Sequence, residues 1–261
     1  MKKETRTTRI VFIIFTAIPL KIRRILFKTL MILFYQFSEK HRLIVLHNLT
    51  RAFPEKDVSE VTEIARDCYK NLGIVAAEFF DILSMTRENT SDWLEVEGLE
   101  NYLRAHEKNK GILSFTGHFG NWEIGAAAFA FFCHPVNIVY RTLDNPVIGG
   151  IVDRVRSYTG NKLLPKGGAA RRIIRLLGKN ENIGILIDQN VSWREGVFVD
   201  FFGRPASTTK GLAALALQTG APVLPSFISR MKDGKYKLVI GPEVDISRTG
   251  DYDRDILENT Q

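Results

Sequence analysis

The residue types best suited to chemistry lie in one stretch, Thr116-Gly117-His118-Phe119-Gly120-Asn121-Trp122-Glu123. The stretch follows an apolar run typical of a strand and precedes a run typical of a helix. On one straight helix, His118 and Glu123 would point about 140° apart and would not meet. We therefore predict that His118 lies in the loop after the strand. Asn121 would then lie near the helix start, and Glu123 in the first turn would reach back toward the imidazole.

A carboxylate that holds one imidazole nitrogen leaves the other nitrogen free to accept a proton. His118 and Glu123 are therefore the predicted catalytic pair, with His118 as the general base. Gly117 and Gly120 supply the backbone freedom that such a turn needs. The structural alternative is a surface histidine beside a glutamate that caps the helix.

Other reaction classes find little support in the sequence. There is no Gly-x-Ser-x-Gly elbow, and Gly120 and Gly125 have P-loop spacing without the lysine that holds phosphate. With no His-Glu-x-x-His motif and only five scattered histidines, we predict neither a metal site nor a cofactor. Cys133-His134 follows an apolar helix, where the end of a core is favoured over a nucleophile pair.

Candidate substrate-binding residues surround this motif. Asn121 lies within it, and Arg141, at a predicted strand end, is placed to contact a substrate or support an oxyanion. Asp188-Gln189 follows the apolar run 183–187, where it would orient substrate hydroxyls or play a structural role. A run of eight cations without an acid spans Arg154 to Lys179; it is either a solvated face or a site for anions, and from it we select Arg154, Arg156 and Lys166.

The pattern along the chain predicts an α/β fold, with a largely parallel sheet flanked by helices. Residues 39–84 have helical periodicity, and from about residue 110 short apolar runs alternate with helical stretches. Such alternation is typical of parallel sheets. We expect strands at 111–116, 136–140, 183–187, 222–228 and 236–240, and helices at 122–132, 146–159, 168–178 and 208–219.

The charge of the chain is concentrated at its N-terminus. The formal net charge is +7, and residues 1–28 hold eight cations against Glu4 alone: Lys2, Lys3, Arg6, Arg9, Lys21, Arg23, Arg24 and Lys28. A basic, apolar start on an otherwise neutral chain favours an anionic membrane surface over nucleic acid. The apolar runs Ile10–Leu20 and Ile25–Phe37 fall short of the roughly 20 residues that span a bilayer. We predict an N-terminal membrane-associated arm over 1–38, interfacial rather than spanning, and a catalytic domain over 39–261; the alternative is a helix packed on the domain.

Several separated motifs resemble the lipid A lauroyl/myristoyl acyltransferase family, within the wider H-x4-D/E glycerolipid acyltransferases. The main match is His118-x4-Glu123, within the sequence Gly-His-Phe-Gly-Asn-Trp-Glu. Further matches are Asn48-Leu49, Ala52-Phe53-Pro54-Glu55, Tyr140-Arg141, Asp188-Gln189, Phe201-Phe202-Gly203, Thr208-Thr209 and Gly220-Ala221-Pro222-Val223-Leu224-Pro225.

The resemblance implies transfer of a fatty acyl chain from an acyl-carrier-protein (or CoA) thioester to a hydroxyl of a lipid A precursor, in lipopolysaccharide biosynthesis. It further implies work at the cytoplasmic face of the inner membrane, without metal or redox cofactor. Members usually continue past Thr260-Gln261 into another helix, so we expect a truncated C-terminus. The alternatives are an acyltransferase for lysophospholipid, glycerol phosphate or a glycosylated lipid, and a non-catalytic module that binds anionic lipid.

Overall fold

The computed structural model describes residues 6–261 and divides the chain into two compact units. The helical unit comprises the described residues up to Ile82 together with Phe201–Arg204. The sheet unit comprises Leu83–Asp200 and Pro205–Gln261. Lys2 and Lys3, and the side chain of Arg6, lie outside the described part, so the predictions for these three cations are not addressed by it.

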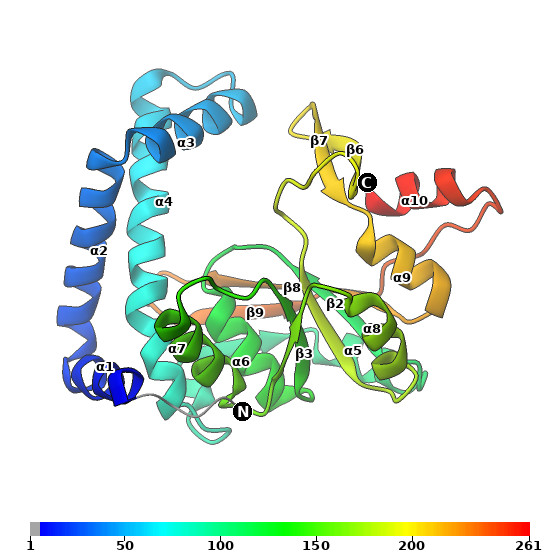
Figure 1. The fold of residues 1–261 in the computed structure, drawn as a ribbon, viewed down its shortest axis with the longest axis horizontal. Coiled ribbons are helices and arrows are strands. Elements are labelled where there is room, and N and C mark those ends of the chain that lie inside the picture. The colour runs from blue at the N-terminus through cyan, green and yellow to red at the C-terminus, as the bar shows by residue number, and fades with distance from the viewer. Residues whose placement is uncertain (1–5) are drawn as a thin grey trace. The chain divides into compact units, whose positions relative to one another are not determined.

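The sheet unit is built on seven strands in the order β1-β9-β8-β2-β5-β3-β4 (Figure 1). Every neighbouring pair is parallel except β8 and β9, which pair antiparallel. The predicted α/β fold with a largely parallel sheet is therefore confirmed. The strands are β1 (Leu94–Glu97), β2 (Ile112–Thr116), β3 (Val136–Tyr140), β4 (Lys162–Pro165), β5 (Asn182–Leu186), β8 (Val223–Arg230) and β9 (Tyr236–Ile240).

Helices connect these strands and cover both faces of the sheet. Those of the sheet unit are α5 (Leu99–His106), α6 (Trp122–Phe132), α7 (Pro146–Ser157), α8 (Ala169–Leu177), α9 (Gly211–Thr219) and α10 (Tyr252–Thr260). α8 and α9 pack beside each other on a core that includes Leu113, Ile183 and Val223. Gly125 of α6 contacts Ile228, which alternates with Val223 along β8 and so faces the other side.

A second, two-stranded sheet joins β6 (Gly196–Phe201) and β7 (Arg204–Thr209). Phe202 and Gly203 between them both have positive φ, at 56° and 70°. Two consecutive residues of this conformation make the tight turn that suits twisted strands.

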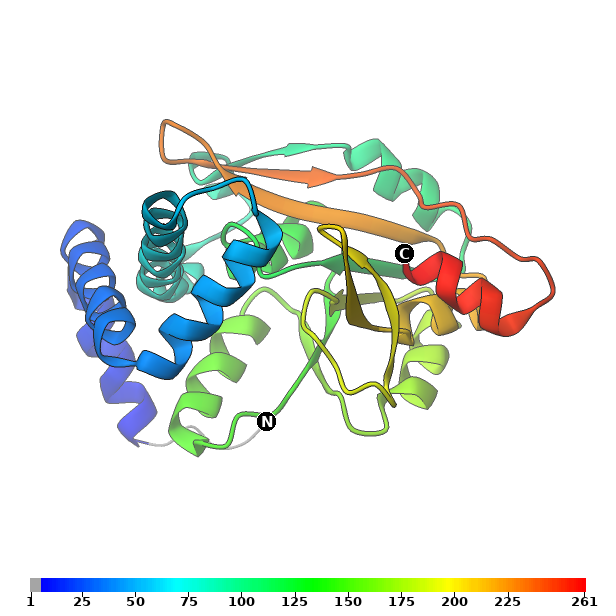
Figure 2. The ribbon, with the colours of Figure 1, turned by 90° about the horizontal axis from the view of Figure 1, so that it is seen from above.

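The helical unit contains α1 (Arg6–Ala17), α2 (Leu20–Phe37), α3 (Glu39–Ala52) and α4 (Val58–Glu78), followed by a 3-10 turn from Phe79. α4 begins at Asp57, whose side chain accepts from the Glu60 N–H while the Glu60 side chain accepts from the Asp57 N–H. This reciprocal cap fixes the start of the helix. Along its length α4 packs against α2 (Figure 2), with Tyr35, Ala65 and Tyr69 buried between them.

Two cations of the predicted arm form ion pairs within this helical unit. Arg23 is 3% exposed, donates to the Ala77 carbonyl at 3.1 Å, and pairs with Asp81. Arg24 pairs with the fully buried Glu78 at 2.6 Å. Arg23 is therefore withdrawn from solvent, and Arg24 is half-buried in a pair with a buried carboxylate. Ser38, at the predicted border of the arm, separates α2 from α3 within this one unit.

None of the described helices combines the length and the apolar character that crossing a membrane requires.

Candidate active site

The His118 motif lies at the carboxyl edge of the sheet, where two neighbouring strands end together. β2 and β5 are parallel, and Thr116 is in register with Leu186. His118 and Asp188 each come two residues after these strand ends. Open α/β sheets commonly carry their binding sites at this edge.

Asp188 holds His118 by two hydrogen bonds. The His118 backbone N–H donates to one carboxylate oxygen at 2.7 Å, and Nδ1 of the imidazole lies 2.9 Å from the other. Both side chains are 37% exposed. Partial burial raises the pKa of Asp188, but the imidazole and the N–H more than offset this, so that the pKa lies below its ordinary value.

This arrangement defines the imidazole's chemistry. An ionised carboxylate on Nδ1 favours the tautomer with its hydrogen on that nitrogen, and Nε2 is left with a lone pair. Among the described residues, no hydrogen bond to Nε2 is found. His118 is therefore oriented as a proton acceptor whose free nitrogen is partly exposed.

Glu123 does not contact the imidazole in this structure, contrary to the geometry predicted from the sequence. It lies in the first turn of α6 and accepts two bonds from Arg156 of α7, from Nε at 2.9 Å and from a terminal nitrogen at 2.5 Å. Burial lowers the pKa of Arg156, yet the bonds to Glu123 outweigh it and leave that pKa raised. The physical reason is competition: a planar guanidinium matches a carboxylate with two parallel bonds.

Trp122 connects the two halves of the site. Its ring meets the His118 imidazole edge to face, with centroids 5.0 Å apart. Its indole N–H donates to Glu123 at 3.0 Å. The contacts therefore run without a break from Asp188 through His118 and Trp122 to Glu123 and Arg156. Trp122 stands in the motif, but sequence reasoning gave it no role.

The turn between strand and helix is tightly constrained. Asn121 caps α6 by accepting from the Ile124 N–H at 3.2 Å, as its predicted position near the helix start requires. Its side chain is fully buried and its amide reaches the Tyr236 hydroxyl at 3.4 Å. Gly120 has φ of 59°, and a β-carbon there would lie 1.9 Å from the Ile228 carbonyl oxygen. Only glycine fits at this position.

With the geometry known, the chain can be compared with other proteins. It matches the profile of the bacterial lipid A biosynthesis acyltransferases over residues 7–260. The chain belongs to this family. The resemblance predicted from the motifs is thereby confirmed, and the chain is an acyltransferase family member rather than a hydrolase or a nucleotide-binding protein.

Curated relatives carry related names. The lipid A biosynthesis lauroyltransferase of Escherichia coli (strain K12) is 30% identical over 211 residues, 79% of this chain and 68% of the relative. The palmitoleoyltransferase of the same organism is 26% identical over 80% of this chain and 68% of its own length. A phosphatidylinositol mannoside acyltransferase of Mycolicibacterium smegmatis is 24% identical over 77% of this chain and 66% of the relative.

The remaining predicted residues of this acyltransferase are exposed. Arg141 is 82% exposed and 3.4 Å from Asp144, and Lys166 pairs with Glu195 at 3.2 Å on the surface. Arg154 and Gln189 are exposed. Arg156, chosen from the same basic run, contacts the His118 motif through its two bonds to Glu123.

The contacts of Cys133 and His134 favour a structural role over that of a nucleophile pair. Burial raises the pKa of the Cys133 thiol to about 12, so that it is protonated near neutrality. His134 Nδ1 bonds the Tyr102 hydroxyl at 2.6 Å, and its ring stacks on His106 at 4.5 Å. In the described part of the chain, no three His, Cys, Asp or Glu side chains are grouped as metal ligands.

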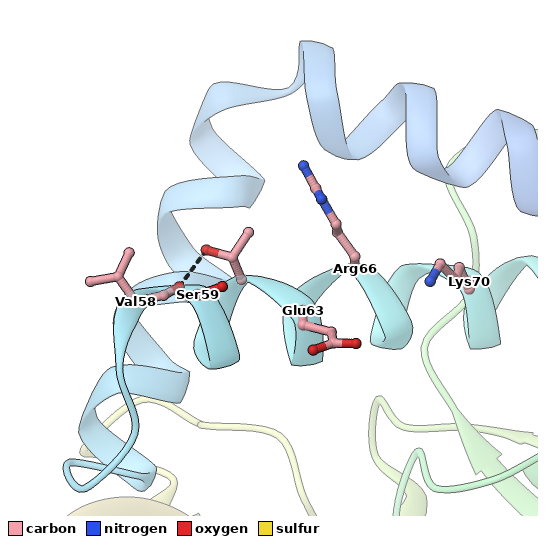
Figure 3. Close-up of a pocket in the computed structure, with 6 residues that line it drawn as sticks. Val58, Ser59, Glu63, Arg66 and Lys70 are labelled. Atoms are coloured by element: carbon pink, nitrogen blue, oxygen red, sulfur yellow. Dashed lines mark hydrogen bonds between the residues drawn. The ribbon is translucent and has the colours of Figure 1, made fainter.

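A separate hollow lies along the first turns of α4 in the helical unit (Figure 3). It is lined by Val58, Ser59, Thr62, Glu63, Arg66 and Lys70. The Thr62 hydroxyl donates to the Val58 carbonyl at 2.7 Å and is therefore occupied within the helix. None of the predicted site residues lines this hollow.

Proposed function

We propose that this chain transfers a fatty acyl group from a thioester, carried on acyl carrier protein or CoA, to a hydroxyl of a lipid A precursor. The single observation that supports it best is the imidazole of His118, which Asp188 orients with Nε2 free at the carboxyl edge of the sheet. Family membership supplies the reaction class, and the names of the relatives supply the acceptor class.

In this proposal His118 acts as a general base. Nε2 takes the proton of the acceptor hydroxyl while the hydroxyl oxygen attacks the carbonyl carbon of the thioester. The tetrahedral intermediate then expels the sulfur, and the imidazolium returns its proton to the departing thiolate. Asp188 stabilises the imidazolium by charge, because its lowered pKa keeps it ionised.

In this proposal Glu123, predicted as the catalytic partner of His118, is a positioning residue that acts through its neighbours. It accepts hydrogen bonds from the indole of Trp122 within the motif and from the guanidinium of Arg156 on α7, and so fixes both groups. A nearby cation would stabilise the negatively charged oxygen of the tetrahedral intermediate. Arg141, which is exposed and only weakly paired, remains the candidate for contact with the acceptor.

Membrane attachment is the second part of the proposal. The chain would work at the cytoplasmic face of the inner membrane, held by the arm of residues 1–38 against anionic lipid. α1 and α2 support this with exposed apolar side chains, among them Ile13, Ile22, Ile25 and Phe37. Arg9 and Lys21 are exposed beside them. Exposed apolar groups with cations are the pattern of an interfacial helix.

The decisive test is acyl transfer by the parent protein and by two variants, His118→Ala and Asp188→Asn. Labelled acyl chains would be supplied as thioesters on carrier protein and on CoA, with a lipid A precursor as acceptor. We expect both variants to lose roughly 10²–10⁴-fold in kcat with KM little changed, because general base catalysis contributes about that much. His47→Ala, at an exposed histidine of α3, is the matched control. A folded His118→Ala variant with near-parental turnover would overturn the base assignment.

A glycosylated lipid is the second candidate acceptor. The phosphatidylinositol mannoside acyltransferases among the relatives favour it, at 24% identity for the Mycolicibacterium protein. Offering both acceptors to the parent protein separates the two candidates. Turnover of neither acceptor, with lipid binding intact, would instead support a non-catalytic lipid-binding module.

A further inference from the structure

Helix α8 presents two sharply different faces. Ala169, Ile173 and Leu177 are buried in the core of the sheet unit. Arg171 and Arg175 are exposed on the outer side, and Lys179 follows directly after the helix, also exposed. Residues four apart on a helix lie about 6 Å along its axis and about 40° around it, so Arg171 and Arg175 form one stripe.

The cations of this stripe differ from others of the same basic run. Arg156 bonds Glu123, Lys162 bonds Glu181 at 3.0 Å, and Lys166 bonds Glu195. For Arg171, Arg175 and Lys179, in contrast, the structure of residues 6–261 contains no ion pair. Arg171 and Arg175 are therefore exposed positive charges without an ion pair in the described part of the protein, while Lys179 lies near enough to Glu181 to help lower the pKa of that carboxyl group.

The stripe begins on the side of the sheet that carries the candidate active site. α8 starts just after β4, which ends at Pro165, and it packs on β5. The carboxyl end of β5 leads to Asp188, which holds His118. The parallel register of β2 and β5 places both strand ends at one edge. Because α8 runs from the end of β4 back to the start of β5 at Asn182, Arg171 lies nearer this edge and Lys179 lies toward the opposite one.

The chemistry of the surface favours an acidic protein over a lipid surface. Among the described residues, none of the large apolar side chains that are exposed lies on α8. An interfacial helix needs an apolar face for the lipid, and the apolar face of α8 is already in the core. A surface of charge alone suits electrostatic docking of a protein with the opposite charge.

We propose that the stripe of Arg171, Arg175 and Lys179 is the docking surface for the acidic carrier protein that delivers the acyl thioester. This inference rests on the proposed function, in which the donor arrives on a carrier or on CoA. Docking along the stripe would place the carrier beside the edge of the sheet where His118 lies, at the Arg171 end of α8. The carrier would be recognised by its acidic surface, and the thioester by the site itself.

The test measures acyl transfer from two donors by a variant in which the charge of the stripe is reversed. Arg171→Glu/Arg175→Glu should lower kcat/KM for the carrier-linked donor roughly tenfold or more, because steering and docking depend on complementary charge. It should leave kcat/KM for the CoA thioester within about twofold, since that donor does not need the stripe. The pair Arg87→Glu/Lys232→Glu, at exposed cations in loops, changes the net charge equally and is the control. Arg171→Lys/Arg175→Lys should keep most of the activity.

Binding of a fluorescently labelled carrier, measured by anisotropy at several salt concentrations, separates this inference from the proposed function. Stripe-dependent carrier binding by a parent protein that transfers from neither donor would defeat the proposed function alone. Equal carrier binding and equal turnover by the stripe variant and the loop control would overturn the docking surface. Loss of binding to vesicles of phosphatidylglycerol, with carrier binding unchanged, would also overturn it and assign the stripe to lipid.

Discussion

The Asp188 carboxylate accepts hydrogen bonds from two groups of His118, its backbone N–H and its imidazole ring. Two bonds to one carboxylate fix both the position of the loop and the orientation of the imidazole. Sequence reasoning named both residues but joined His118 to Glu123, because sequence neighbours are easier to connect than strand neighbours. The signal that could have joined them is the equal offset of two residues from the ends of β2 and β5. Using it requires knowing that these strands are adjacent, which apolar patterning alone does not tell.

The lowered pKa of Asp188 predicts how its contribution to stability depends on pH. A carboxyl group whose pKa is lower in the folded state stabilises the fold above its unfolded pKa of about 3.9, and this contribution is lost as the pH falls through the folded pKa. The stability difference between the parent and Asp188→Asn should therefore be largest near neutral pH and shrink below about pH 4. Urea unfolding at a series of pH values measures it. A difference that grows on acidification would contradict the assigned shift.

At the scale of the elements, the turn between β2 and α6 depends on the missing side chain of Gly120. Gly120→Ala forces a β-carbon toward the Ile228 carbonyl at a positive φ. We expect a loss of at least about 3 kcal/mol in the free energy of unfolding, from left-handed strain and a backbone clash together. Gly234→Ala is the control, because Gly234 has φ of 89° but nothing within 4 Å of the added carbon. That variant should lose only about 1–2 kcal/mol; equal losses would refute the clash.

The pair of Glu123 and Arg156 joins α6 to α7 beside the motif. The side chains are 10% and 22% exposed, so removing either one strands a largely buried charge. We expect Glu123→Gln and Arg156→Gln to destabilise individually, and the double variant to cost less than their sum. The coupling energy from a double-mutant cycle should be roughly 1–3 kcal/mol. Additive losses would mean that the pair does not act as a unit.

The elements that could be predicted are those with strong apolar patterns. β3 and β9 were predicted with the bounds that the structure has, and α6 likewise. The missed elements have weaker patterns. β1 is a four-residue edge strand in which apolar residues alternate with glutamates, and β4 is equally short and ends in proline. α10 depends on its cap at Asp251. Short edge strands bury little apolar surface, so their sequences carry little periodicity.

At the scale of the whole molecule, the sequence shows the cluster of N-terminal cations. It does not show which of them form ion pairs within the helical unit and which stay exposed. Arg23 and Arg24 have the same side chain as Arg9, and nothing in their local pattern marks them as ion-paired within the helical unit. The difference comes from Asp81 and Glu78, more than fifty residues further along the chain. Removing residues 1–38 would also remove α2, on which α4 packs. Point substitutions are therefore a sharper test of membrane attachment than a deletion.

The final prediction concerns the exposed apolar side chains of α2. Ile22, Ile25 and Phe37 are 56%, 63% and 83% exposed, so serine at these positions should leave the fold intact. Burial of a large apolar side chain contributes roughly 1.5–3 kcal/mol, and partial insertion of three should still change vesicle binding by at least about tenfold.

The measurement is co-sedimentation with vesicles of phosphatidylethanolamine and phosphatidylglycerol at low salt. Substituting Val58, Leu103 and Leu257 by serine removes comparable exposed apolar groups outside the arm and is the matched control. The control should bind as the parent does, because its three sites lie on α4, α5 and α10 rather than on the arm. Parental binding by the α2 variant would instead assign these side chains to contacts within the protein or with another chain, and would remove the arm from the proposed attachment.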